Sequence, residues 1–428
     1  MQPYPPLQTL LAAAMLREQG VEVAFFDTTF NRDFVSALDR VRPDLVAVCE
    51  DNFNFLTKMC LEQNRRLALE IAQAAGALGI RAVINSSDAT TNPHVYLESG
   101  FDSVILGELE DTLADISESA SCGDLPKAGT ASDRGLGHPR APISDLDRIP
   151  PPAWDLVDLE PYRRAWVDAH GHFAINLVAS RGCPYRCNWC AKPIYGSMYR
   201  FHSPDRVARD MQRIKELCRP DQIWFADDIF GLSGKWVREF ASCVERRNAA
   251  IPFRIQSRCD LMTRDTVAAL RRAGCVEVWM GAESGSQRVL DAMDKGTRVA
   301  QIDEARENLR RHGIRACLFL QFGYLGEEWE DIESTIKMIR RVQPDDIGVS
   351  VSYPMQGTRF YNIAKAQIGA KANWSDSGEL ARMLRTQFPS DLYRALAEAL
   401  HREVRRNGSA AELRRAWERV EDFRCVSC

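Results

Sequence analysis

Three cysteines stand close together near the middle of the chain, and their spacing indicates a metal cluster. Cys183, Cys187 and Cys190 are separated by three and then two residues. Cysteine thiolates are the usual ligands of iron–sulfur clusters, and each thiolate occupies one iron. Three such thiolates on one loop predict a [4Fe-4S] cluster whose fourth iron stays open to a further ligand.

Two other uses of these cysteines fit the sequence less well. A structural zinc site needs a fourth Cys or His at comparable spacing, and the nearest downstream candidate, His202, follows an irregular stretch. Disulfides belong mainly to small secreted domains, whereas this chain has 428 residues and starts without the basic and apolar blocks of a signal peptide. We therefore expect the three thiols to be free for metal binding.

A second pair of thiols, Cys425 and Cys428, follows Arg424 at the end of the sequence. A neighbouring arginine lowers the pKa of a thiol and makes it a better nucleophile or ligand. Three roles stay open for this possible second thiolate site. The pair could hold a soft metal or metalloid substrate, it could ligate an auxiliary cluster or the active site, or it could be a frayed end without a role.

The elements before the cysteines alternate between helix and strand, which predicts a parallel sheet covered on both faces. A domain of this kind is expected over residues 1–120. The helices are predicted at 10–19, 34–41, 64–78, 92–99 and 113–119, and the strands at 21–27, 44–49, 80–85 and 101–106.

Residues 119–152 lack hydrophobic periodicity and are rich in Gly, Pro, Ser and Asp, and a linker is therefore predicted over residues 121–172. Beyond it, six strands alternate with helices over residues 173–365, and the first strand leads directly into the cysteines. In α/β barrels the active groups follow the carboxyl ends of strands. Residues 366–428 are predicted to be helical, at 380–384, 392–405 and 411–420. The strands are expected at 173–179, 222–228, 253–257, 276–281, 316–322 and 346–350.

The cysteine triad, with Trp189 just before its last member, resembles the signature loop of the radical S-adenosylmethionine (SAM) enzymes. Polar or Gly-rich motifs at four later strand ends also resemble this family. The resemblance implies a partial (β/α)6 barrel in which Cys183, Cys187 and Cys190 hold the cluster and the open iron grips the amino and carboxylate groups of SAM. The SAM-binding residues that it implies are Trp189, Asp227, Asp228, Glu283, Ser284, Phe322, Gly323 and Leu325.

Each motif has a physical reason beside the resemblance. A carboxylate such as Asp227 or Asp228 can accept a charge-assisted hydrogen bond from the SAM ammonium, although two acids at a strand end could also simply solvate a turn. A glycine such as Gly323 lets the backbone approach a ligand closely. The Glu283–Ser284 motif resembles the one that meets the ribose and carboxylate of SAM.

The segment 1–120 resembles the cobalamin-binding domain that precedes the barrel in one subfamily, through Pro43–Val48 and Gly107–Leu113. The resemblance implies a Rossmann/flavodoxin-like sheet domain and cobalamin as a further cofactor. Two features depart from it, because the usual opening strand before Pro5 is missing and so is the Asp-x-His-x-x-Gly motif. The first histidine is His94. A domain that has lost its cofactor stays an alternative.

The expected function is radical chemistry on a small molecule, in which the cluster reductively cleaves SAM and cobalamin-dependent methyl transfer follows. The alternative is a cobalamin-independent reaction, such as aminocarboxypropyl transfer from SAM to trivalent arsenic held by the terminal cysteines. An electron carrier or sensor is less favoured, because it needs four cluster ligands and no SAM motifs. The class implies a flavodoxin- or ferredoxin-type electron donor.

The composition is that of an ordinary soluble protein. The formal net charge is −4, with 45% hydrophobic and 27% charged residues, and no basic run or long apolar span occurs. Nucleic-acid binding would show clustered basic charge, and a membrane span would need about 20 apolar residues. We therefore expect neither partner, and a cytoplasmic location.

Overall fold

The computed structural model describes residues 2–53, 61–120, 128–133, 135–369 and 380–426. The described chain forms two compact units, and the boundary between them passes through the cysteine loop. The first unit runs through Cys183 and takes up Lys192–Asp227 as well. The second contains Pro184–Ala191 and the described chain after Asp228.

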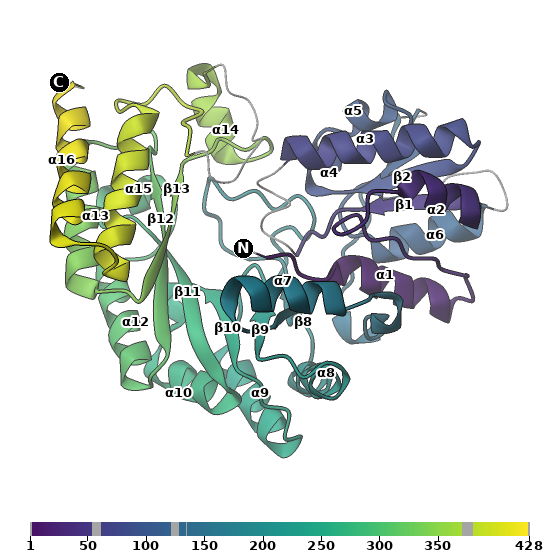
Figure 1. Cartoon of the computed structure of the whole chain (residues 1–428), viewed down its shortest axis with the longest axis horizontal. Coiled ribbons are helices and arrows are strands. Elements are labelled where there is room, and N and C mark those ends of the chain that lie inside the picture. Colours follow the sequence, from purple (N-terminus) through teal and green to yellow (C-terminus); the bar gives the residue numbers. More distant parts are fainter. Residues whose placement is uncertain (1, 54–60, 121–127, 134, 370–379, 427–428) are drawn as a thin grey trace. The chain divides into compact units, whose positions relative to one another are not determined.

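The first unit begins with the predicted α/β domain, in which helices alternate with strands (Figure 1). Its parallel strands are β1 (Leu45–Cys49), β2 (Arg81–Asn85) and β3 (Ser103–Ile105). Its helices are α1 (Leu7–Glu18), α2 (Phe34–Val41), α3 (Leu61–Ala77), α4 (Ser87–Thr91), α5 (Pro93–Leu97) and α6 (Glu110–Ala120).

Helices cover both faces of this sheet, as the alternation predicts. Side chains point to opposite faces along a strand, so Val83 and Ile84 of β2 enter two different cores. Val83 packs with Leu113 of α6, and Ile84 packs with Ala72 of α3 and Tyr96 of α5. The predicted Rossmann-like sheet domain is therefore confirmed.

The strand predicted at 21–27 is wrong. None of these residues is buried, and the segment has no strand partner. It is held by side chains instead, because the Tyr162 hydroxyl donates a hydrogen bond to Asp27 and the Tyr162 ring meets Phe30 edge-on at 4.8 Å. Strand β1 consequently ends the sheet order.

The segment predicted as a linker contains regular structure that the composition did not indicate. Strands β4 (Thr130–Ser132) and β5 (Gly135–Leu136) add to β3 in antiparallel register, and Val104 lies opposite Ala131. Helix α7 (Glu160–His170) follows. Strands of two or three residues are too short to show the periodicity on which sequence prediction depends.

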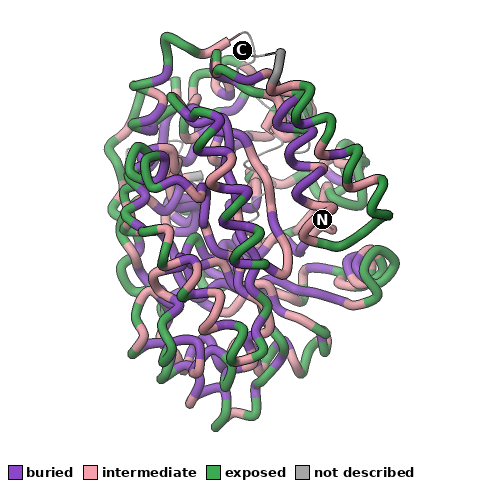
Figure 2. The backbone as a smooth tube through the Cα atoms, turned by 90° about the vertical axis from the view of Figure 1, so that its left-hand side faces the viewer, coloured by how far each residue is buried: buried purple, intermediate pink, exposed green. Residues whose placement is uncertain are grey.

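Six strands form the second sheet, in the order β13-β12-β11-β10-β9-β6, which confirms the predicted partial barrel. Their buried residues appear in purple in Figure 2. The strands are β6 (Ala174–Leu177), β9 (Gln222–Phe225), β10 (Phe253–Ser257), β11 (Cys275–Glu283), β12 (Arg315–Phe322) and β13 (Asp346–Val351). The helices between them are α8 (Pro204–Leu217), α9 (Gly234–Arg246), α10 (Arg264–Ala273), α11 (Gln287–Ala292), α12 (Val299–Arg311) and α13 (Trp329–Val342).

Local sequence explains where these helices begin and which face they bury. In α9 the Ser233 side chain accepts a hydrogen bond from the Trp236 backbone N–H, which satisfies one of the free donors of the first turn. Trp236, Phe240 and Val244 are spaced by four residues and are all buried. The helix therefore presents one apolar stripe to the sheet.

The cysteine loop is closed at its base by a ribbon of two short antiparallel strands, β7 (Ser180–Arg181) and β8 (Arg200–Phe201). Gly182 begins the loop with a φ of +77°. A Cβ on Gly182 would lie 2.3 Å from the Met198 carbonyl oxygen and 2.9 Å from that of Tyr195. Only glycine fits this position without moving backbone atoms.

The C-terminal region consists of α14 (Arg359–Ala364), α15 (Ser390–Arg405) and α16 (Ala410–Val426). The helix predicted at 380–384 is wrong, because this segment is extended and Leu384 forms an antiparallel bridge with Ile368. The possible thiolate site of Cys425 and Cys428 lies outside the described side chains. Among the described helices, none is both long enough and apolar enough to cross a membrane.

Substituting Gly182 by alanine should destabilise the protein far more than the same change at Gly196 in the same loop. Both residues have positive φ, which costs an L-residue about 1–2 kcal/mol. A Cβ at Gly196 meets nothing within 4 Å, whereas one at Gly182 meets backbone oxygens. Urea denaturation of both variants checks this, and equal losses in the free energy of unfolding would contradict it.

Candidate functional site

The three cysteines of the loop form no disulfide with another described residue, and each is partly exposed. In the first unit, the Cys183 N–H donates to the Gly196 carbonyl, and Lys192 Nζ donates to the Cys183 carbonyl at 2.7 Å. In the second unit, the Cys190 N–H donates to the Cys187 carbonyl. Within the described chain, no three His, Cys, Asp or Glu side chains lie in metal-ligand geometry. The ligand set stays a prediction.

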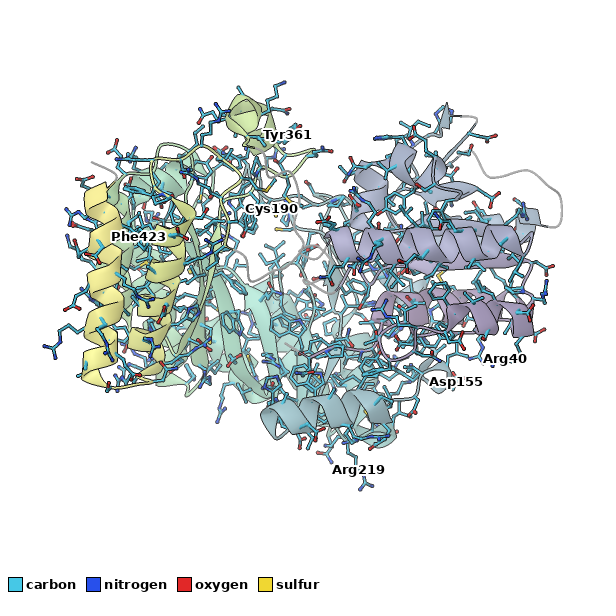
Figure 3. All side chains as sticks on the ribbon, turned by 45° about the horizontal axis from the view of Figure 1, so that its top comes forward. Arg40, Asp155, Cys190, Arg219, Tyr361 and Phe423 are labelled. Atoms are coloured by element: carbon cyan, nitrogen blue, oxygen red, sulfur yellow. The ribbon has the colours of Figure 1, made fainter. Side chains whose placement is uncertain are left out.

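Asn188 anchors the middle of the loop. Its side-chain amide donates to the Ala292 carbonyl at 2.7 Å, and its backbone N–H donates to the Met293 carbonyl at 3.0 Å. Its backbone carbonyl accepts from the N–H of Phe360 in α14. Figure 3 marks Cys190 in this loop and Tyr361 in α14. Backbone groups at the end of α11 and in α14 therefore hold the stretch between Cys187 and Cys190 in place.

Trp189 lies in the apolar cluster that supports the loop, with Met293, Tyr324, Phe360 and Leu325. Its indole nitrogen is buried and has no hydrogen-bond partner in the structure. A buried donor without a partner costs about 1–3 kcal/mol. An orphaned donor next to a metal-ligand candidate fits a site that is completed by a bound group.

Two buried cations, Arg258 and Lys295, interact electrostatically with Cys187. The Arg258 guanidinium carbon lies 3.6 Å from the centroid of the Tyr185 ring. Burial alone would lower the pKa of Lys295, but the negative charges of Glu283 and Cys187 raise it above its ordinary value. Two buried positive charges therefore lie near the loop that carries the candidate ligands.

Glu283 ends β11 in a strained conformation and is paired with Lys295. Its φ is +59°, which is uncommon outside glycine and often marks a functional site. Lys295 Nζ donates to Glu283 Oε1 at 2.7 Å, and both side chains are 6% exposed. A Cβ on Gly281 would lie 2.5 Å from both of these atoms. Gly281 therefore makes the room that the buried pair occupies.

The structure gives the residues of the predicted acidic and polar motifs different surroundings. Asp227 is buried and accepts hydrogen bonds from the Ala179 N–H, at 3.1 Å, and from the Ser180 hydroxyl, whereas Asp228 is exposed. Ser284 is fully buried, and its hydroxyl bonds to that of Thr335 at 3.1 Å. Asp227 and Ser284 thus have internal partners that hold neighbouring backbone.

The turn after β12 is held by a buried carboxyl group, Glu327. The Gly323 N–H donates to Glu327 Oε2 at 2.6 Å, while Glu327 Oε1 is buried without a partner. Burial raises the pKa of Glu327 to about 8. Gly323 has a φ of +70°, and a Cβ there would lie 3.1 Å from the Tyr393 hydroxyl. The predicted residues Phe322, Gly323 and Leu325 therefore belong to one rigidly supported turn.

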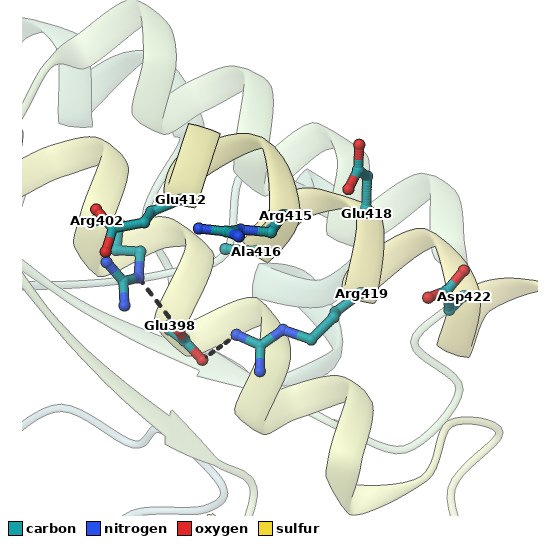
Figure 4. A pocket seen from close by; sticks show the side chains of 8 residues that line it. All are labelled: Glu398, Arg402, Glu412, Arg415, Ala416, Glu418, Arg419 and Asp422. Carbon is teal, nitrogen blue, oxygen red and sulfur yellow. Dashed lines mark hydrogen bonds and ion pairs between the residues drawn. The ribbon is translucent and has the colours of Figure 1, made fainter. Parts of the chain in front are cut away.

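Two hollows lie in the second unit. One, of about 170 Å³, is lined by the turn residues Tyr324–Glu328 together with residues of the 367–387 region such as Arg385. The other, of about 450 Å³, lies on α15 and α16, where Glu398 pairs with Arg402 at 3.1 Å and with Arg419 (Figure 4). The second is a groove of charged surface side chains and contains no residue predicted for the site.

Sequence reasoning missed Arg258, Lys295 and Glu327. Lys295 lies twelve residues after its partner Glu283, in a loop without periodicity. Arg258 follows β10, and no sequence motif marks it. Glu327 stands within the glycine turn that was singled out. The signal that could have found it is an acidic residue four positions after a glycine whose N–H needs an acceptor.

Replacing Glu327 by glutamine should remove a pH dependence of stability. An unfolded glutamic acid titrates near 4.5, whereas the folded pKa is about 8. The native state therefore retains a proton between these values, and this contribution to stability is complete below pH 4.5 and lost as the pH rises to 8. The advantage of Glu327→Gln over the wild type should grow by at most about 1.4 kcal/mol per pH unit in that range.

Denaturation curves from pH 5 to pH 9 test this expectation, with Glu330→Gln as a control on the exposed first turn of α13. The control should differ from the wild type by a constant amount. A constant difference for Glu327→Gln as well would show that Glu327 is ionised throughout.

Part of the chain is similar in sequence to known proteins. Residues 177–339 match the family model of the radical SAM superfamily. The chain is 26% identical over 377 residues to "Uncharacterized methyltransferase PH0819" of Pyrococcus horikoshii, which covers 85% of this chain and 79% of that protein.

Two solved structures share the fold. One is the radical SAM methyltransferase TsrM from Kitasatospora setae with cobalamin and a [4Fe-4S] cluster bound, with a TM-score of 0.70 and 21% identity, over 85% of this chain and 72% of TsrM. The other is the cobalamin-dependent radical enzyme OxsB with aqua-cobalamin and SAM bound, with a TM-score of 0.74 and 16% identity, over 100% of this chain and 69% of OxsB. Residues 177–339 are therefore similar to the radical SAM superfamily, and the described chain shares its fold with these two cobalamin-dependent enzymes.

Proposed function

We propose that this protein is a radical SAM enzyme that uses a [4Fe-4S] cluster, SAM and cobalamin to transfer a methyl group to a carbon of a small molecule. The observation that carries the proposal is the anchored cysteine loop after β6, in a chain that shares its fold with OxsB over its full length. The similarity to proteins named as methyltransferases supports the same reaction class.

Cys183, Cys187 and Cys190 would hold the cluster. Their chemistry fits, because all three are partly exposed thiols outside any described disulfide, on a loop that Asn188 anchors. The buried cation Arg258 also interacts electrostatically with Cys187. When bound, a cluster of this type supplies the electron that cleaves SAM. The surrounding protein orients SAM and excludes water from the radical.

SAM would be held by strand ends of the second sheet. Asp228 is exposed and would accept a charge-assisted hydrogen bond from the SAM ammonium, whereas Asp227 is buried. The Glu283–Lys295 pair would meet the polar part of SAM, and the Gly323 turn would lie along the adenine. A backbone turn supported by Glu327 can receive a flat base without reorganising.

Cobalamin would bind at the carboxyl edge of the first sheet, where buried polar atoms lack partners. Glu50 Oε1 follows β1, and Thr112 Oγ1 follows β3; both are buried and unpaired. Burial raises the pKa of Glu50 to about 8, so its carboxyl group is protonated at pH 7 and can both donate and accept. The amide side chains of a corrinoid need such partners. Because no histidine precedes His94, the loop after β1 offers cobalt no imidazole.

The cobalamin-independent alternative, with aminocarboxypropyl transfer to trivalent arsenic, is not favoured. It depends on Cys425 and Cys428, which lie outside the described side chains, whereas the similarity to methyltransferases extends over 85% of the chain. The reaction needs a one-electron reductant, and a flavodoxin- or ferredoxin-type protein would supply it.

Anaerobic purification with iron and hydroxocobalamin tests the proposal. We expect about four irons and one corrinoid per chain, and both 5′-deoxyadenosine and S-adenosylhomocysteine as products of SAM. Iron without corrinoid would contradict the cobalamin part. Methylthioadenosine as the main product would contradict methyl transfer and favour the alternative.

Replacing Cys187 by alanine should abolish SAM cleavage and lower the iron content, because one thiolate ligand of the cluster is lost. Cys218→Ala is a matched control, because Cys218 is also a free and partly exposed thiol but lies at the end of α8. The control should keep its iron and its activity. Undiminished SAM cleavage by Cys187→Ala would contradict the assignment.

A further inference from the structure

The ribbon at the base of the cysteine loop places two arginines directly opposite each other. Arg181 of β7 pairs with Arg200 of β8 in the strand register. Arg181 is 1% exposed and Arg200 is 5% exposed. Like charges at opposed positions destabilise a strand pair, and a buried charge without a partner is costlier still. The ribbon therefore depends on negative charge from elsewhere.

Two carboxylates from the turn after β3 supply that charge. Glu110, the first residue of α6, accepts two hydrogen bonds from the Arg181 guanidinium, at 3.1 and 2.5 Å. Glu108 lies 3.6 Å from Arg181, forms an ion pair with Arg200 and accepts a hydrogen bond from the Ile143 N–H. Two positive and two negative side chains thus balance within one buried cluster.

Aromatic rings enclose the cluster. Phe53 and Tyr195 stack with their centroids 5.1 Å apart and their planes 13° apart. The Arg181 guanidinium carbon lies 5.5 Å from the Phe53 centroid and 5.2 Å from the Tyr195 centroid. Phe53 follows β1, while Tyr195 belongs to the cysteine loop. The rings keep water away from the guanidinium, and the ion pair between Arg181 and Glu110 is therefore stronger than it would be in solvent.

The position of this cluster in the chain indicates its role. Arg181 stands two residues before Cys183, and Glu108 and Glu110 follow β3 at the carboxyl edge of the first sheet. All of these residues lie in the first unit. The guanidinium of Arg181 makes two hydrogen bonds to one carboxylate, which fixes direction as well as distance.

We propose that Glu108, Glu110, Arg181 and Arg200 form a charge clamp whose role is to position Cys183 for cluster binding. This inference rests on the proposed function, because it needs a cluster on the cysteine loop. The clamp residues do not ligate the cluster and are positioning residues. Loosening the clamp lets the first ligand move, so the cluster is released faster although its three thiolates are intact.

Arg181→Lys is the sharpest test, because it keeps the positive charge and loses the two-pronged hydrogen bond. Arg206→Lys is the matched control in the same unit. Arg206 of α8 is also buried, pairs with Asp210 at 2.7 Å and donates to the Ile149 carbonyl. Both substitutions keep the positive charge and change the hydrogen bonds of a buried arginine to a carboxylate, but only Arg181 lies at the base of the loop.

The measurement is the rate at which a chelator removes iron from the anaerobically reconstituted full chain, with folding checked by circular dichroism and the reduced cluster by electron paramagnetic resonance. We expect Arg181→Lys to lose its cluster about tenfold faster than Arg206→Lys, because changes next to metal ligands cost about 10–100-fold in metal affinity. The resonance signal of Arg181→Lys should also broaden. Equal rates and identical spectra would overturn the clamp.

A second pair of variants covers the outcome in which Arg181→Lys does not fold. Glu110→Gln is then compared with Asp210→Asn, and the same difference in iron release is expected. The double variant Arg181→Lys/Glu110→Gln should release iron no faster than the worse single variant, because residues that act as one pair are not additive. Additive effects would overturn the pairing.

Failure of the clamp and failure of the proposed function can be told apart. A wild-type chain that takes up no iron after reconstitution overturns both. A wild-type chain that holds about four irons, with Arg181→Lys and Arg206→Lys indistinguishable, overturns only the clamp and leaves the cluster assignment standing.

Discussion

Buried charge in this protein has to be neutralised locally, and this constraint determines where the candidate site residues lie. Arg181 and Glu110 are both at most 1% exposed, so neither can leave its partner without leaving an ion in an apolar interior. The same holds for Glu283 and Lys295 at the end of β11. One pair holds the start of the cysteine loop and the other a strand end. In each pair, the attraction between the two buried charges fixes the position of the side chains, which a short loop alone would leave free to move.

Hydrophobic periodicity was sufficient to predict the α/β architecture, because both sheets bury their strands and present helices on their faces. The six strands of the second sheet were each predicted to within a few residues. The errors fall where tertiary partners decide. Residues 21–27 have a strand-like sequence but pair with no strand, and the side chain of Tyr162 holds them instead. Residues 380–384 are apolar because Met383 and Leu384 are buried in a segment that is not helical.

The sequence predicts those site residues that stand close together along the chain. It does not predict residues that meet only after folding. Three cysteines within eight residues are visible in any sequence. The partner of Glu283 is not, because Lys295 reaches it only after β11 and α11 have formed. The internal bonds of Asp227 and Ser284 were invisible for the same reason.

Because of the space at Gly281, substitutions at positions 281, 283 and 295 depend on one another. Its missing side chain leaves room for the Glu283 carboxylate and the Lys295 ammonium, which a Cβ would approach to 2.5 Å. A larger residue at 281 is compatible with folding only if the ion pair is lost or rebuilt. Any variant or homologue that keeps the acid and the base must therefore keep the glycine. The triplet Gly281, Glu283 and Lys295 is a signature by which sequences with the same strand end can be recognised.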